Sequence, residues 1–123
     1  MSEENKYELV KFIDGEFELE VNVSSKEDTI WMSANQMAIL FNKDEKTIRK
    51  HINNIFKDGE LIYDNNTQKM RVVGVKQHIN MYTLNVIISV GYRVKLKRWI
   101  IFRKWVRWKI NYFQNGNCPN RKE

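Results

Sequence analysis

Five polar side chains that are suited to contacts with nucleic acid lie close together between residues 44 and 56. They are Lys46, Thr47, Arg49, Lys50 and Asn53. An arginine can donate two parallel hydrogen bonds to the edge of guanine, an asparagine can pair with adenine, and a lysine is equally suited to phosphates. The grouping predicts a surface for double-stranded DNA, provided that one element holds these side chains on one side.

A helix is the element that the apolar residues of this segment favour. Ile48, Ile52 and Ile55 repeat at intervals of four and three residues, which defines one buried side of a helix. The polar residues then fall largely on the other side. Two packed helices with an ordinary solvated basic face have the same pattern, so this alternative stays open.

A shorter amphipathic pattern, from Ala34 to Phe41, comes directly before this helix. Ser33 and Gln36 have the spacing of a capping box, in which each side chain binds a backbone amide at the start of a helix. Asn42 enters the left-handed conformation at low cost and ends the first helix, and Asp44 is expected to cap the second. Two helices joined by so short a turn are typical of a helix-turn-helix, whose second helix lies in the major groove.

An N-terminal β-hairpin is predicted before the two helices. Asp14 and Gly15 suit a tight turn between the strands 7–13 and 16–23. Alternation of apolar and acidic residues in the second strand predicts one buried face and one acidic face. Residues 29–32 are expected to form a short strand that leads into the first helix.

A second hairpin is predicted after the two helices. Residues 69–75 and 78–82 are expected to pair, with Lys69 and Arg71 on a wing beside the second helix. Further helices are predicted at residues 83–90 and 97–114. The sequence therefore predicts an α+β fold, with an N-terminal β-hairpin, a winged helix-turn-helix-like core and a long C-terminal helix.

Apolar residues cover an arc of roughly 200° on the predicted helix 97–114, which is wider than one packing face requires. The aromatic residues of this candidate interaction face are Trp99, Trp105, Trp108 and Tyr112. Burial against the helix 83–90 and the N-terminal hairpin is one interpretation. An interface with a second copy, giving a homodimer, or with a missing domain is another. A third is a basic, aromatic helix that lies on a membrane.

Catalytic and metal chemistry have little support. His51 and His78 have no acid placed beside them by the sequence, so no general base or nucleophile pair is indicated. Cys118 is the single cysteine, and it makes no familiar metal-ligand set with the two histidines. We expect no enzyme activity, no cofactor and no metal.

The formal net charge of +6 is distributed unevenly. Residues 1–32 contain three lysines and nine acidic residues, so the rest of the chain carries 18 basic and 6 acidic residues. The basic part is the one that would meet a polyanion. No apolar run approaches the roughly 18 residues that cross a bilayer, and the N-terminus does not have the pattern of a signal segment. A cytoplasmic protein is expected.

Three segments, MSANQMAILFNKDEKTIRKHINNIFKDGEL, YTLNVIISVGYRV and FRKW, resemble in order the virulence-associated RhuM-like family of bacteria. The resemblance runs from about residue 15 to residue 116. It implies a DNA-binding protein that is often encoded on mobile or pathogenicity-associated DNA. Departures are Asn42-Lys43-Asp44, where the family usually has a glycine, an aliphatic and a small capping residue, and Trp99-Ile100-Ile101, where it has small and polar residues.

The expected organisation is a single RhuM-like domain over residues 7–114, with disordered tails at 1–6 and 115–123. Family members commonly continue much further, so the chain resembles only their N-terminal portion, and a truncation and a frameshift product both stay open as explanations of the tail after residue 116. The predicted function is sequence-selective binding of double-stranded DNA by the helix 44–56, with a role in transcription regulation. The alternative is a protein interaction module, such as a phage-type antirepressor or a partner in a toxin system.

Overall fold

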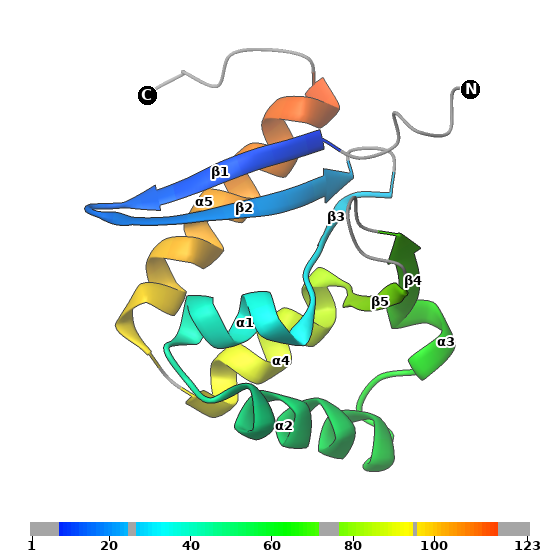
Figure 1. The fold of residues 1–123 in the computed structure, drawn as a ribbon. Helices are drawn as coiled ribbons and strands as arrows, with labels where there is room; N and C mark the ends of the chain where they lie inside the picture. Colours follow the sequence, from blue (N-terminus) through cyan, green and yellow to red (C-terminus); the bar gives the residue numbers. More distant parts are fainter. Residues whose placement is uncertain (1–7, 25–26, 72–76, 95, 116–123) are drawn as a thin grey trace.

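The computed structural model describes residues 8–24, 27–71, 77–94 and 96–115, and these residues form an α+β fold (Figure 1). One sheet has the antiparallel order β1 (Glu8–Asp14), β2 (Phe17–Ser24) and β3 (Thr29–Trp31). The other pairs β4 (Thr67–Arg71) with β5 (His78–Tyr82). The helices are α1 (Ala34–Phe41), α2 (Glu45–Lys57), α3 (Tyr63–Asn66), α4 (Leu84–Val94) and α5 (Lys97–Asn115).

The β1–β2 hairpin turns at Gly15, whose φ of +67° is a conformation that glycine adopts without strain. The alternation predicted for β2 is confirmed, because its apolar residues face the core and Glu18 and Glu20 are exposed. Phe12 of β1 lies directly opposite Leu19 and is also buried. The hairpin therefore has one apolar face, which α5 covers, and one acidic face in solvent (Figure 1).

The capping box at the start of α1 is confirmed. The Ser33 hydroxyl accepts a hydrogen bond from the Gln36 amide at 3.1 Å, and the Gln36 side chain accepts one from the Ser33 amide at 2.9 Å. Asn42 ends α1 in the left-handed conformation, as predicted, with a φ of 54°. Asp44 lies at the N-cap of α2, but its side chain makes no capping hydrogen bond, so this part of the prediction is wrong.

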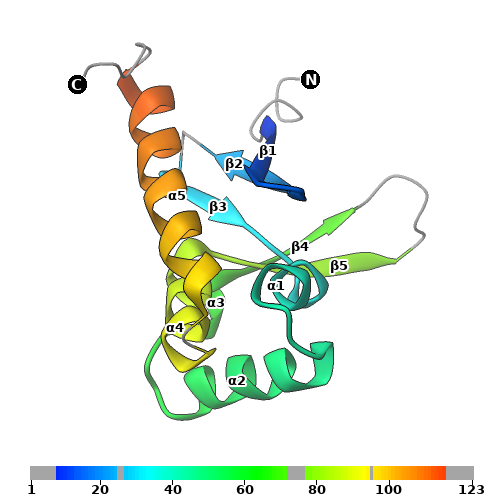
Figure 2. The same ribbon diagram turned by 90° about the vertical axis from the view of Figure 1, so that its left-hand side faces the viewer.

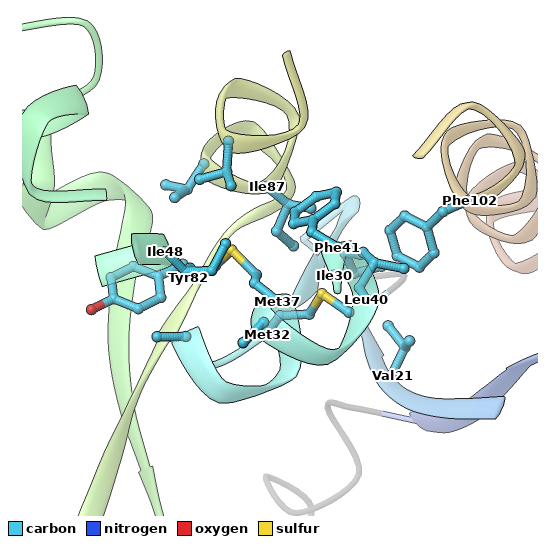
Figure 3. Packing of buried hydrophobic residues seen from close by; sticks show 14 of the residues in the cluster. Val21, Ile30, Met32, Met37, Leu40, Phe41, Ile48, Tyr82, Ile87 and Phe102 are labelled. Atoms are coloured by element: carbon cyan, nitrogen blue, oxygen red, sulfur yellow. The ribbon is translucent and has the colours of Figure 1, made fainter. Parts of the chain in front are cut away.

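Two backbone hydrogen bonds join the sheets at Met32 and Tyr82. The Met32 amide donates to the Tyr82 carbonyl at 3.0 Å, and the Tyr82 amide donates to the Met32 carbonyl at 2.8 Å. The core forms around this junction, with side chains such as Met37 of α1, Ile48 of α2 and Ile87 of α4 packed together (Figure 3). One continuous core thus holds both sheets and the helices around them.

The short helix α3, which was not predicted from the sequence, follows the loop after α2. Asn66 at its end is buried, and the Asn66 side-chain nitrogen Nδ2 donates to the Ile62 carbonyl at 2.8 Å. The Thr83 hydroxyl donates to the Asn66 side-chain oxygen at 2.6 Å. Two polar groups that are buried together are therefore satisfied by each other, which fixes the end of β5 against α3.

The start of α5 packs into the core. Trp99 is only 3% exposed and contacts Phe41, with ring centroids 5.7 Å apart, while Phe102 contacts Phe12 at 5.0 Å. This placement corrects the assignment of Trp99 to an interaction face, because its ring is already enclosed by α1 and α4. Within the described residues, no helix has the length and apolar character that crossing a bilayer requires.

Gly91 lies inside α4, which extends to Val94 and so runs four residues past its predicted end. A Cβ atom added at Gly91 would lie 2.6 Å from ring atoms of Trp99, closer than van der Waals contact permits. The absence of a side chain is therefore what lets α4 and α5 meet.

We expect Gly91→Ala to lower the free energy of unfolding by about 1–3 kcal/mol, because the added methyl group overpacks this contact. Helix propensity alone would act in the opposite direction by about 1 kcal/mol. Urea denaturation of the variant measures the sign. Ser89→Ala in the same helix is the control and should change the stability by less than about 0.5 kcal/mol; a Gly91→Ala protein more stable than the wild type contradicts the packing.

Candidate nucleic-acid interface

The solvent side of α2 carries the candidate residues of this helix. Ile48, Ile52 and Ile55 are buried, as predicted. The residues that are exposed in the structure include all of the predicted polar set on α2, namely Lys46, Thr47, Arg49, Lys50 and Asn53. Four cations, counting Lys57, thus lie on one exposed helix of 13 residues.

A groove with a volume of about 570 Å³ separates the first half of α2 from the β4–β5 hairpin. The N-terminal end of α2 and the hairpin lie on the side of the molecule away from α5, with the start of α1 between them (Figure 2). Residues of all three elements line the groove: Ser33, Ala34, Asn35, Glu45, Arg49, Lys69, His78, Ile79, Asn80 and Tyr82. The groove therefore brings together Arg49 and Lys69, two candidate residues that are 20 positions apart in the sequence.

The hairpin places Lys69 opposite Asn80 and Arg71 opposite His78 in its register. Lys69 is exposed. The side chain of Arg71 lies outside the described residues, so its place relative to the groove is not part of the structure. Lys46, Lys50 and Asn53 are exposed on α2 but do not line the groove, which shows that the candidate residues form two adjoining surfaces rather than one pocket.

Glu45 links α1 to α2 inside the groove. Its Oε1 accepts a hydrogen bond from the Asn35 side-chain nitrogen Nδ2 at 3.1 Å, and its Oε2 accepts one from Arg49 Nε at 3.0 Å. Arg49 Nη2 also donates to Oε2, which completes an ion pair one helical turn apart. The hydrogen bond from Asn35 and then that from Arg49 hold the pKa of the Glu45 carboxyl below its usual range. Glu45 is therefore ionised at neutral pH.

His51 occupies the opposite edge of α2, near the end of α4. Its side chain is half-buried, and burial lowers its pKa, with smaller contributions from the positive charges of Arg93, Lys50 and Lys43. Arg93 itself donates to Glu60 at 2.8 Å and so ties α4 to the loop after α2. His51 is consequently neutral at physiological pH, in a positively charged environment.

Eight of the ten lining residues were not among the sequence candidates, and they include Asn35, Glu45, His78 and Asn80. Glu45 and Arg49 have the spacing of a helical ion pair, which is a signal that the sequence offered. The others could not have been found in this way, because the contact of α1 with the hairpin depends on the junction at Met32 and Tyr82. Among the described residues, no group of three or more His, Cys, Asp or Glu side chains could hold a metal ion.

The remaining candidate aromatics lie on α5, away from this groove. Trp105 is half-buried against Phe12, with ring centroids 5.2 Å apart. Trp108 is 45% exposed, and the Lys109 ammonium lies 4.7 Å from the centre of its ring. The side chain of Tyr112 lies outside the described residues.

Comparison of the chain with protein-family models, with curated proteins and with solved structures found no match. The resemblance to the RhuM-like family consequently stays a prediction from the residues.

The lowered pKa of His51 predicts a pH-dependent stability. The ordinary pKa of histidine is about 6.5, so the unfolded chain binds this proton more readily than the folded protein does. The stability contributed by neutral His51 is complete above about pH 6.5 and is lost as the pH falls toward the folded pKa. We expect the free energy of unfolding to decrease on acidification, and His51→Gln to flatten that slope in urea titrations across this range. His78→Gln is the matched control and should retain the slope, whereas an equal slope in His51→Gln and the wild type would refute the assignment.

Proposed function

We propose that this protein binds double-stranded DNA, with α2 in the major groove and the β4–β5 hairpin against the neighbouring backbone as a wing. The observation that carries the proposal is the orientation of α2. Its isoleucine stripe is buried, and Lys46, Arg49, Lys50 and Asn53 are all exposed. A helix with this distribution of residues is suited to binding a polyanion, because its cations face solvent while its apolar side packs in the core.

The dimensions of α2 agree with such a role. Thirteen residues make a helix about 20 Å long. A helix of this kind fits the major groove, which is about 12 Å wide. In this arrangement Asn53 contacts a base edge, while Lys46 and Lys50 contact phosphates. Lys69 on the wing side of the groove adds a phosphate contact.

The distribution of charge in space supports the orientation. The acidic face of the β1–β2 hairpin, with Glu18 and Glu20 exposed, lies at the end of the molecule opposite to α2 (Figure 1). DNA would repel the first end and attract the second. This acidic face therefore disfavours approach of DNA by the hairpin.

The RhuM-like resemblance extends this proposal to a regulatory protein of mobile bacterial DNA, acting on transcription in the cytoplasm. This extension rests on the residues quoted above, from MSANQMAILFNKDEKTIRKHINNIFKDGEL onward. A winged helix-turn-helix would combine α1, α2 and the β4–β5 hairpin in the order that these elements have here.

A protein interaction module, such as an antirepressor or a partner in a toxin system, is the second candidate. The observation that favours it is apolar exposure on α5, where Ile100, Ile101 and Trp108 are each more than 40% exposed. Exposed apolar residues that lie near each other can mark a contact with another protein or with a second copy. This function would use α5 and would not depend on Arg49.

We expect Arg49→Ala combined with Lys50→Ala to weaken binding to duplex DNA by roughly 10- to 100-fold at low salt, because the contacts of both cations with DNA are lost. Fluorescence anisotropy at about 50 mM salt measures the change, and repeating it at about 200 mM salt gives the dependence on phosphate contacts.

The matched control removes the same charge from another surface. Lys104→Ala combined with Arg107→Ala takes two exposed cations from α5 and should leave most of the affinity. Equal losses in the two double variants would indicate only a general attraction between a basic protein and DNA. Unchanged affinity in the α2 variant would remove the support for α2 as the reading helix.

A further inference from the structure

Three donors in the groove converge on one anionic position. Arg49 Nε and Nη2 and the Asn35 side-chain nitrogen Nδ2 all donate to the carboxylate of Glu45. Two of these donors belong to one guanidinium group, whose planar fork fits a carboxylate or a phosphate equally well. The position is therefore built to hold an anion with two or more oxygens, and a side chain of the protein itself occupies it.

The occupant can leave without disturbing the fold. Glu45 and Arg49 are both solvent-accessible, and their ion pair lies one turn apart on a helix surface. Pairs of this kind contribute little to stability. The core below them depends on Ile48 and Ile52, which do not take part in the pair.

We propose that the Glu45 carboxylate stands where one backbone phosphate of duplex DNA binds, and that DNA displaces it from Arg49 and Asn35. The inference rests on the proposed binding of DNA by α2. A phosphate at this position receives the same donors and carries the same single negative charge as the carboxylate. Lys69, which lines the other side of the groove, attracts the same phosphate.

The Glu45 carboxylate has two effects on the binding of DNA. It holds Arg49 toward the groove before DNA arrives, and it competes with the phosphate for the same hydrogen bonds. Glu45 should therefore reduce the affinity for DNA, and its effect should depend on Arg49. A carboxylate that acted only by repelling DNA would have the same effect whether or not Arg49 were present.

The test is a cycle of four proteins: the wild type, Glu45→Gln, Arg49→Ala and the double variant. We expect Glu45→Gln to tighten binding to duplex DNA roughly 3- to 10-fold at about 50 mM salt, because the competing charge is removed while the fork of Arg49 remains. In the Arg49→Ala background the same change should have less than about a 2-fold effect.

Two matched controls accompany the cycle. Glu60→Gln removes the carboxylate of another exposed ion pair, with Arg93, and should leave the affinity near that of the wild type. Asn35→Ala removes a donor of the site and should weaken binding several-fold, whereas Asn85→Ala changes an exposed asparagine at the corresponding position of α4 and should not.

The outcomes separate this inference from the function on which it rests. A gain of affinity in Glu45→Gln that disappears without Arg49 supports the phosphate site. An equal gain in both backgrounds, or in Glu60→Gln, overturns the inference while DNA binding stands. Absence of binding to DNA by every variant overturns the proposed function and the inference together.

Discussion

Burial of the isoleucine stripe fixes which side of α2 meets solvent, and the candidate site depends on this orientation. Ile48 and Ile55 are completely buried and Ile52 nearly so. Each such side chain stabilises the fold by about 1.5–3 kcal/mol relative to an exposed one, so rotating the helix would be costly. Lys46, Lys50 and Asn53 are held outward as a consequence, without needing partners of their own.

The second constraint is the junction between the sheets, which sets the distance from α2 to the hairpin. Met32 lies two residues before the start of α1, and Tyr82 is the last residue of β5. The backbone hydrogen bonds between Met32 and Tyr82 therefore hold the start of α1 beside the end of β5. The hydrogen bond between Thr83 and Asn66 holds the end of β5 against the end of α3. Arg49 and Lys69 share a groove because these contacts place their elements side by side.

Local patterns in the sequence predicted much of this arrangement, because the contacts that make them lie a few residues apart. The capping box at Ser33 and Gln36, the left-handed Asn42 and the isoleucine stripe are of this kind. The enclosure of Trp99 and the place of Asn35 in the groove depend on contacts across the chain, which periodicity does not contain. Helix α3 was missed because Tyr63–Asn66 is a single turn, stabilised by Asn66 through partners at Ile62 and Thr83.

The measurement that tests the central claim most directly is selection of bound sequences from a random pool of duplex DNA by the whole protein, at about 50 and 200 mM salt. Phosphate-driven affinity falls steeply over that range, so base contacts can be distinguished from general attraction. We predict an enriched motif at both salt concentrations, read by the face of α2 that carries Asn53. Binding that leaves the pool unenriched and disappears at the higher salt concentration would contradict sequence reading by α2.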